Sequence, residues 1–439
     1  KSAIGNGNGL VRSFIAGVSP LVLSEFASGF NIGNFPLQSP QFKYLFGLTT
    51  ADVTKGLKSI HSMPLTTQKV LLKHIEDHHD GYRFFDGPDE PLFNTSRVLH
   101  SLRSIQEQLN AGVSKEETIL AELKAFKDTN TKPAESALRV VLSNPQALDL
   151  VRTLLSSPEH IYRPSFELKF DFRLGELARI DSTESTASVA SFLFFQGALT
   201  WAKASTRQTP LLMIPNKLAR KEYFEELKAM YNIGDLNQLR GALLSVIDTN
   251  SATGFLRPFE VQVLSRLQGR DILNGEVAFH NLLFTTLLLC RRPQDVVYSE
   301  YKTKSSDRTS NRSGSNAVDV VYQCLDGERK TKRLVFSLKD IQVPYIPQIA
   351  PKSTAWEVLV TASEELKRAN AEDLRLLKYE NKWARNLATV GEVEAACLKE
   401  LKEKYLPDLR QDAESEGEVV AFALTRVGIH RVLASEAVL

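Results

Sequence analysis

"RLVFSLKDI", residues 333–341, is the stretch that decides how the C-terminal part of this chain is interpreted. It is a run of strand-forming residues that ends in a lysine and an aspartate. A second strand-like run, "AVDVVYQCL" at 317–325, precedes it and is joined to it by "DGERKTK". Two such runs around a polar turn predict an antiparallel hairpin. The polar end is either a buried strand reaching water or one side of a ligand site.

The register of this hairpin determines which polar residues meet. Successive side chains of a strand point to opposite faces, so Ser337 and Lys339 share one face. A connection made of residues 326–330 would set Asp319 opposite Ser337. A tight turn at Asp326-Gly327 would shift the pairing and separate the two. Asp319, Ser337 and Lys339 therefore form one candidate site only in the first register.

A helix and a strand are expected before the hairpin. "NGEVAFHNLLFTTLLLC", residues 274–290, predicts a helix, and "DVVYSEYKT", residues 295–303, predicts a strand. Glu276 is the carboxylate of this helix that could point back at the sheet. Asp340 follows Lys339 directly, so we expect its side chain on the opposite face.

An acid on a helix, an aspartate on the second strand and a lysine on the third resemble the PD-(D/E)XK nuclease fold. The resemblance implies that Asp319 and Glu276 bind Mg²⁺, which generates hydroxide, and that Lys339 orients the attacking water. Ser337 stands where that fold has a carboxylate. A hydroxyl brings no negative charge to a hard cation, so Mg²⁺ affinity should fall. The candidate catalytic set is Glu276, Asp319, Ser337 and Lys339.

Segments in the first half of the chain carry a wider resemblance. "FIAGVSPLVLSEFASGFNIG" (14–33), "DGYRF" (80–84), "LFN" (92–94) and "IPN" (214–216) occur in an order similar to the AAA-ATPase-like family. Members of that family commonly carry a C-terminal PD-(D/E)XK domain, and related modules occur in Crinkler-type effectors. The likeness runs through roughly residues 10–345.

The family resemblance implies two nucleotide contacts. Ser19 would be the polar group of a sensor strand nearest a γ-phosphate, and Arg83 would be a lid arginine that approaches the nucleotide. The alternative for Arg83 is a surface ion pair with Asp80 or Asp86. No G-x-x-x-x-G-K-[ST] motif occurs, and "IGNGNGL" (4–10) offers glycines without the lysine and hydroxyl. We therefore expect ATP to bind only in a more complete protein.

Two further polar stretches have open interpretations. "YKTKSSDRTSNR", residues 301–312, contains basic residues among serines and threonines, which suits nucleic-acid phosphates or a solvated loop. The basic residues concerned are Lys302, Lys304, Arg308 and Arg312. "HIEDHHD", residues 74–80, places His74 and His78 one helical turn apart, which suits a metal or a solvated helix end.

Composition limits the class of protein. The chain has 54 Lys and Arg against 52 Asp and Glu, so nucleic-acid affinity must come from local patches. Its three cysteines, Cys290, Cys324 and Cys397, form no CxxC pair, which favours a reducing compartment. Apolar runs are shorter than the ~18 residues of a membrane span. We expect an intracellular protein, nuclear or cytoplasmic, without a membrane partner.

The expected fold class is α/β plus α, in three parts. Residues 1–105 would be the sensor-strand and helical-lid side of an AAA-like ATPase, 106–260 a helical connector, and 261–439 a restriction-endonuclease-like α/β domain. The expected function is a nucleic-acid-associated ATPase/nuclease-like protein with a degenerate Mg²⁺ site, weak or inactive in cleavage. The alternative is a non-enzymatic module that binds DNA or a protein partner, or associates with itself.

Overall fold

The computed structural model describes most of the chain from residue 47 onward. The described residues are Tyr44 and 47–60, 63–83, 90–113, 115–125, 135–142, 144–157, 161–168, 183–205, 210–267, 275–302, 317–327, 329–350, 355–380, 387–407 and 417–438. The expected sensor strand and its candidate residue Ser19 lie outside them.

The chain divides into two units where the sequence predicts three parts. The N-terminal unit consists of residues 1–154 and 160–223, and the C-terminal unit of residues 155–159 and 224–439. Residues of the expected connector, 106–260, are therefore shared between the two units. Both helices and sheets are present, so the fold is mixed α/β as expected.

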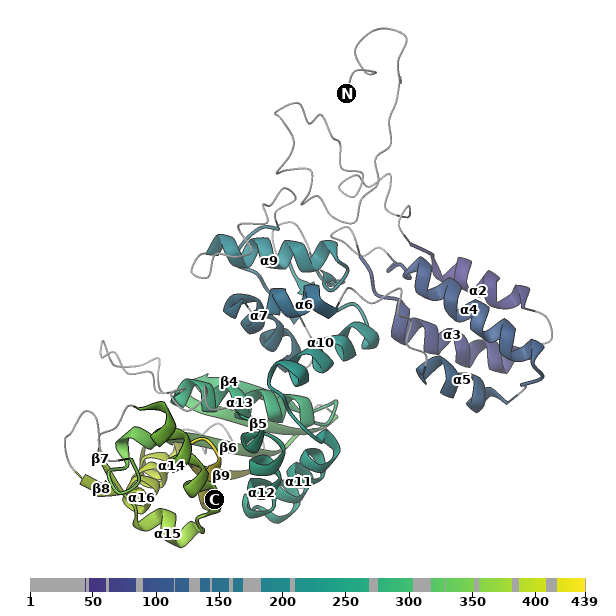
Figure 1. Ribbon diagram of the computed structural model, residues 1–439. Coiled ribbons are helices and arrows are strands. Elements are labelled where there is room, and N and C mark those ends of the chain that lie inside the picture. Colours follow the sequence, from purple (N-terminus) through teal and green to yellow (C-terminus); the bar gives the residue numbers. More distant parts are fainter. Residues whose placement is uncertain are drawn as a thin grey trace. The chain divides into compact units, whose positions relative to one another are not determined.

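Helices dominate the N-terminal unit (Figure 1). They are α2 (Thr50–Ser59), α3 (Leu65–His79), α4 (Thr95–Asn110), α5 (Glu116–Ala125), α6 (Glu135–Leu142), α7 (Pro145–Ser156), α9 (Thr183–Phe195) and α10 (Lys217–Met230). Helices α7 and α10 cross the boundary between the two units. A small antiparallel sheet joins β1 (Ile161–Tyr162), β3 (Leu212–Met213) and β2 (Thr200–Trp201) in that order.

Two helices of this unit begin at side-chain caps. Thr49 accepts a hydrogen bond from the backbone of Asp52, whose carboxylate accepts from the Thr49 backbone, which is a complete capping box. Asn94 accepts from the backbone N–H of Arg97 at the start of α4. The buried faces of α2 to α5 then pack into one apolar cluster.

The motifs "DGYRF", "LFN" and "IPN" meet in space. Tyr82 and Leu92 exchange backbone hydrogen bonds of 3.1 and 2.8 Å. The Asn216 side chain donates to the carbonyl oxygen of Asp80 at 2.9 Å. These hydrogen bonds join backbone segments that are far apart in the sequence and satisfy their polar groups.

Gly81 offers a test of this packing. We expect Gly81→Ala to destabilise the N-terminal unit by about 2–4 kcal/mol, because the new Cβ would lie 2.0 Å from the Pro215 carbonyl oxygen at a φ of +99°. Gly112→Ala is the matched control, since Gly112 also has a positive φ (+82°) but open space around its Cβ position. It should lose about 1 kcal/mol. Equal losses, measured by hydrogen exchange in α3 and α4, would contradict the close contact.

The C-terminal unit is built on a five-stranded sheet with the order β10-β9-β6-β5-β4. Its strands are β4 (Val296–Lys302), β5 (Ala317–Asp326), β6 (Arg329–Ile341), β9 (Glu418–Val427) and β10 (Arg431–Val438), with β7 (Lys378–Glu380) and β8 (Leu387–Thr389) in a separate hairpin. Its helices are α11 (Leu236–Thr249), α12 (Thr253–Gln262), α13 (Glu276–Cys290), α14 (Trp356–Arg368), α15 (Ala371–Leu376) and α16 (Val390–Glu400). Short turns η3 (Leu264–Arg266), η6 (Val343–Tyr345) and η7 (Leu401–Tyr405) complete the unit.

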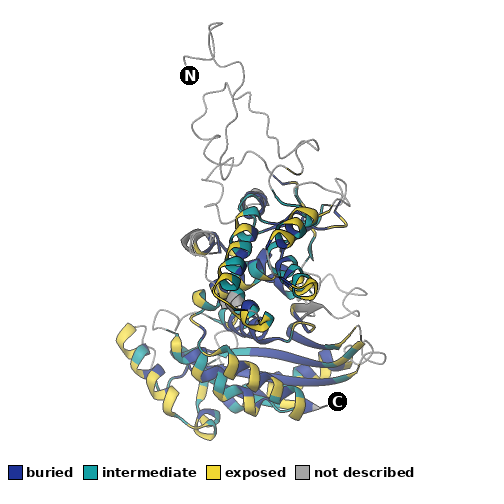
Figure 2. Ribbon diagram, turned by 90° about the vertical axis from the view of Figure 1, so that its right-hand side faces the viewer, coloured by how far each residue is buried: buried dark blue, intermediate teal, exposed yellow. Residues whose placement is uncertain are grey.

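The sheet contains both antiparallel and parallel neighbours. β4, β5 and β6 are antiparallel neighbours, whereas β9 joins β6 in parallel after the helical segment that contains α14 and α16. The tail "GIHRVLASEAVL" carries no clear sequence signal but forms β10, antiparallel to β9. Figure 2 shows these central strands mostly in the colour of buried residues.

Helices α13 and α16 cover opposite faces of the sheet. Cys397 of α16 contacts Ser337 of β6. Arg426 lies over the ring of Phe279 in α13 and pairs with Asp340. Ser337 and Asp340 are an odd number of residues apart on one strand, so they belong to opposite faces. The expectation that Asp340 and Lys339 lie on opposite faces of the sheet is thereby confirmed.

The β5–β6 hairpin reaches the expected register by an unexpected route. Asp326 pairs with Arg329, so the connection is a tight turn rather than residues 326–330. A β-bulge between Cys324 and Leu325 then shifts the ladder by one residue, leaving Val320 opposite Phe336. The next positions along the ladder are 319 and 337. Asp319 therefore does stand opposite Ser337.

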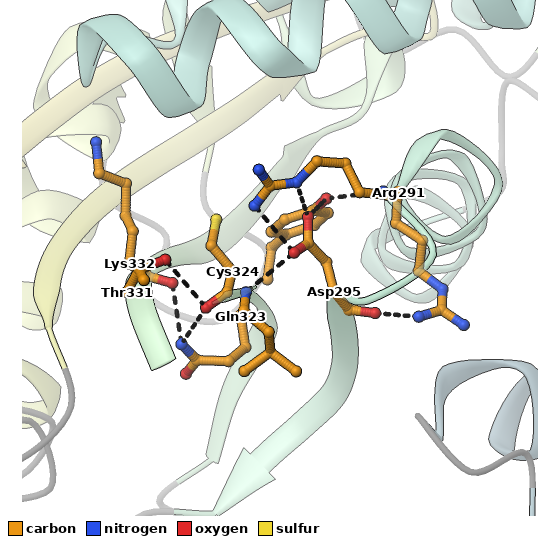
Figure 3. A network of polar contacts seen from close by, with 9 residues as sticks. Arg291, Asp295, Gln323, Cys324, Thr331 and Lys332 are labelled. Carbon is orange, nitrogen blue, oxygen red and sulfur yellow. Dashed lines mark hydrogen bonds and ion pairs between the residues drawn. The ribbon is translucent and has the colours of Figure 1, made fainter. Parts of the chain in front are cut away.

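A buried carboxylate holds the bulge in place. Asp295, which is fully buried, accepts a hydrogen bond at 3.0 Å from the backbone N–H of Leu325, the residue at the bulge (Figure 3). The same carboxylate accepts from the Tyr322 hydroxyl at 2.6 Å and from Arg292 at 2.7 Å. Three polar groups thus share one charge, which satisfies the buried oxygen atoms of the carboxylate.

A second side chain secures the same bulge. Gln323 donates from Nε2 to the carbonyl oxygen of Lys332 at 3.0 Å and to that of Cys324 at 3.2 Å (Figure 3). Arg333 donates to the Gln323 side-chain oxygen at 3.0 Å. The amide therefore bridges both strands where the regular ladder is interrupted.

We expect Asp295→Ala to weaken the hairpin by about 3–5 kcal/mol, because it leaves the Arg292 charge and the Leu325 amide without their shared partner. Hydrogen exchange of the peptide covering residues 318–337 should accelerate. Asp326→Ala, an exposed acid at the turn of the same hairpin, is the control and should have little effect. Similar exchange in both variants would show that Asp295 does not maintain the register.

Candidate functional site

Asp319 lies at the centre of the candidate site. Its Oδ2 accepts a hydrogen bond from the backbone N–H of Leu338 at 2.8 Å. Burial raises the pKa of the carboxyl above its ordinary value, and hydrogen bonds from Leu338 and Ser337 and the nearby charge of Lys339 offset part of this effect. The protein therefore holds this carboxylate firmly but does not fully compensate its charge.

Ser337 occupies the position next to Asp319 on the neighbouring strand. It is 6% exposed. Its Oγ accepts a weak hydrogen bond from the Cys397 thiol, with 3.6 Å between sulfur and oxygen. Its hydroxyl thus lies between the carboxylate of β5 and a thiol of α16 and supplies no negative charge.

Lys339 is held as a cation by the acids around it. Burial by itself would lower the pKa of its ammonium group, but the neighbouring acidic groups, Glu276 foremost and Asp319 among them, outweigh this and raise it. Lys339 consequently remains charged at neutral pH and can donate hydrogen bonds to an anionic ligand.

Glu276, the first residue of α13, belongs to the same electrostatic cluster. Burial raises the pKa of its carboxyl, the charge of Asp319 adds to the increase, and the charge of Lys339 opposes it. Helix position supports the placement, because His280, one turn further along α13, donates from Nε2 to the Asp319 carbonyl oxygen at 2.8 Å. The structure therefore brings together Glu276, Asp319 and Lys339, with Ser337 beside them.

Two neighbours of the candidate site, His280 and Cys397, were not predicted from the sequence. His280 could have been found, since its spacing from Glu276 places both on one helix face. The Ser299 hydroxyl also lies 3.3 Å from its Nε2. Cys397 gave no signal, because a residue 60 positions from Ser337 meets it only through the packing of α16 on the sheet.

Asp340 is excluded from the cluster by a buried ion pair. Arg426 donates to Asp340 at 2.6 Å, and the two side chains are only 1% and 2% exposed. Arg426 also donates to the backbone carbonyl of Gly275, which precedes α13. This pair fixes the start of α13 and therefore the place of Glu276 relative to the end of β6.

The histidines of "HIEDHHD" contact one another and the helix backbone. The rings of His74 and His78 stack at 4.2 Å between centroids, and His78 Nδ1 lies 2.8 Å from the His74 carbonyl oxygen. Burial, with the nearby charge of Arg97, lowers the pKa of His79 to about 3, so that this ring stays neutral. Within the described parts of the chain, no group of three or more His, Cys, Asp or Glu residues is arranged to hold a metal ion.

Arg83 is held through its backbone by Thr200. The Arg83 N–H donates to the Thr200 hydroxyl oxygen at 2.6 Å, and the same hydroxyl donates to the Arg83 carbonyl at 3.0 Å. The Arg83 charge also counteracts the burial that raises the pKa of Asp80. This is consistent with the expected proximity of Arg83 and Asp80.

The remaining candidates fall largely outside the described residues. Lys302 ends β4 in register with Ala317. Ser19, Lys304, Asp86, Arg308 and Arg312 lie outside the described ranges. Over the same ranges, no helix is long and apolar enough to cross a membrane.

Comparison with protein-family models, with curated proteins and with solved structures finds no match to this chain. Any assignment of function to the cluster must therefore start from its own geometry and charges.

Asp319 should reduce the stability of the folded chain as the pH rises. Its pKa in the folded chain lies above the ordinary value of 3.8, so the unfolded chain loses the proton first and unfolding is favoured above that pH. Asp319→Asn keeps an acceptor for the Leu338 N–H but cannot ionise. Its stability relative to the parent should increase between about pH 4 and about pH 7.

Urea denaturation at both pH values measures this difference. Asp326→Asn, which alters an exposed acid, is the control and should show no such trend. A stability difference for Asp319→Asn that is the same at both pH values would mean that the Asp319 carboxylate is not desolvated.

Proposed function

We propose that the C-terminal unit is a nuclease-like module that associates with nucleic acid and whose Mg²⁺-dependent cleavage is weak or absent. The observation that carries this proposal is the hairpin register, which sets Asp319 opposite Ser337 with Lys339 on the same face. The order of elements, a helix bearing Glu276 followed by three antiparallel strands, agrees with the resemblance to PD-(D/E)XK nucleases.

The residues present fit a divalent cation only in part. Oxygen ligands suit Mg²⁺, and Asp319 and Glu276 would supply them from β5 and α13. A bound Mg²⁺ supplies a hydroxide nucleophile and charge neutralisation at a phosphodiester. Ser337 adds an oxygen without charge, and burial disfavours ionisation of both acids. Low affinity for the cation follows from this reduced charge.

Lys339 has a role that needs no metal. It is a protonated ammonium group among partly desolvated acids, where its attraction to a phosphate is less screened than at an open surface. Lys302, Lys304, Arg308 and Arg312 would add phosphate contacts that position the nucleic acid. Binding of nucleic acid can therefore persist when cleavage does not.

A non-enzymatic module is the second candidate. The contact between Ser337 and Cys397 favours it, because a buried hydroxyl packed against a thiol serves the protein core as well as it would serve a ligand. The bound partner would then be DNA or a protein. For the N-terminal unit, we propose that Arg83, with Ser19, contacts a nucleotide, as the resemblance to AAA-like ATPases implies.

Restoring the acid on β6 tests the proposal. Ser337→Asp adds a carboxylate beside Asp319, so Mg²⁺-dependent cleavage of single- and double-stranded DNA and of RNA should increase at least about tenfold over the parent, equivalent to about 1.4 kcal/mol. Ser337→Asn has nearly the same shape without the charge and should not gain activity. The double variant Asp319→Asn/Ser337→Asp should return to background, which controls for a contaminating nuclease.

Two outcomes would contradict the proposal in different ways. Robust cleavage by the parent that Asp319→Asn abolishes would show that the site works with serine and is not degenerate. No cleavage and no Mg²⁺ response in Ser337→Asp, with nucleic-acid binding unaffected by Lys339→Ala, would favour the non-enzymatic protein-binding module.

A further inference from the structure

Helix α14 carries a groove that is separate from the candidate site. Its volume is about 250 Å³. The residues that line it come from α14 and from the turn before this helix: Ile349, Glu357, Val358, Thr361, Ala362 and Glu365. Pockets for small molecules typically measure about 300–1,000 Å³. The groove is smaller than these pockets, and its size suits one aliphatic side chain of a partner.

Apolar side chains form the inner part of the groove. Ala362 is 2% exposed, and the partly buried Ile349 packs against the apolar cluster to which Ala362 belongs. Val358 is 39% exposed, so part of the apolar lining is open to water. An aliphatic side chain that entered the groove would remove this apolar surface from water, which favours binding.

Two carboxylates give the groove a negative charge. Glu357 and Glu365 are both exposed, and neither forms an ion pair with another described residue. No described side chain of the lining is basic. The Thr361 hydroxyl donates to the Glu357 carbonyl oxygen at 3.0 Å, so its proton is already used within the helix. The groove therefore attracts cationic groups and repels phosphates and carboxylates.

The spacing of the two acids limits the shape of a matching ligand. Glu357 and Glu365 are eight residues apart, which corresponds to about 12 Å along the helix axis. In an extended peptide, residues i, i+2 and i+4 lie on the same side and span about 13 Å. Basic residues at i and i+4 would thus meet the two carboxylates, while an aliphatic residue at i+2 enters the groove between them.

We propose that the groove binds an extended segment of a partner protein that carries a basic, an aliphatic and a basic residue at alternate positions. Charge complementarity selects this occupant, because nucleic acid would bring phosphates to the two carboxylates. The inference goes beyond the proposed function. It concerns a surface that includes no residue of the cluster around Asp319 and Lys339, so it holds whether or not that cluster supports cleavage.

Fluorescence anisotropy of a labelled peptide, Lys-Ser-Leu-Ser-Lys, with the full chain tests the inference. The parent should bind with a Kd below about 1 mM. The double variant Glu357→Gln/Glu365→Gln should bind about tenfold more weakly, because each exposed ion pair contributes modestly. Glu364→Gln is the matched control: Glu364 is also exposed but lies outside the groove, where it pairs with Lys367 at 3.7 Å, and the variant should bind as the parent does.

Two further arms test the apolar contact and the fold. Replacing the leucine of the peptide by serine should weaken binding to the parent at least about fivefold, since the aliphatic contact is lost. The charge-reversed variant Glu357→Lys/Glu365→Lys should lose the basic peptide and bind Glu-Ser-Leu-Ser-Glu instead. A misfolded variant would bind neither peptide, so this exchange separates a lost contact from a lost fold.

Three outcomes would overturn the inference. The first is a parent Kd above about 1 mM, or a loss of binding in Glu364→Gln equal to that in the double variant. The second is a parent that sediments as a dimer, becomes a monomer in Glu357→Gln/Glu365→Gln and binds no peptide, which would make a second copy of the chain the occupant. The third is displacement of the peptide by a DNA oligonucleotide whose own binding the same double variant abolishes. None of these outcomes bears on the Mg²⁺ response of Ser337→Asp, so the proposed function stands or fails separately.

Discussion

The hydrogen bond from the Leu325 amide to the buried Asp295 carboxylate is the interaction on which the candidate site depends. It holds a bulge that moves the β5–β6 ladder by one residue. Because side chains alternate along a strand, the loss of that one-residue shift would turn Asp319 and Ser337 to opposite faces. The site thus depends on a carboxylate that belongs to neither strand of the hairpin.

Buried charges are compensated differently on the two faces of the sheet. On the face of α13, Asp340 and Arg426 are both almost completely buried and neutralise each other directly. On the face of α16, Asp319 has only hydrogen bonds and the more distant Lys339 and His280 as compensation. The first arrangement is a closed ion pair, which is structural. The second leaves charge that a ligand could use.

Ser337 occupies the position opposite Asp319 without bringing a charge to it. A carboxylate there would have added a third desolvated negative charge beside Asp319 and against the Cys397 thiol. The hydroxyl removes that repulsion and donates to Asp319 instead. A carboxylate at this position would favour a cation but add an uncompensated buried charge, whereas the hydroxyl does neither.

Sequence patterns alone determined the local features of this protein. Alternation within "RLVFSLKDI" separated Lys339 from Asp340, because this effect acts between adjacent residues of one strand. Strands β4 to β6 and helix α13 were likewise predicted, since their periodicity and apolar content are intrinsic to each segment.

The tertiary structure alone decided the bulge, the parallel entry of β9, the existence of β10 and the contact of Cys397 with Ser337. Each of these depends on backbone hydrogen bonds or packing between segments distant in sequence. The sequence of one strand shows which of its side chains share a face. Which residues of two strands lie opposite each other depends on the register between them.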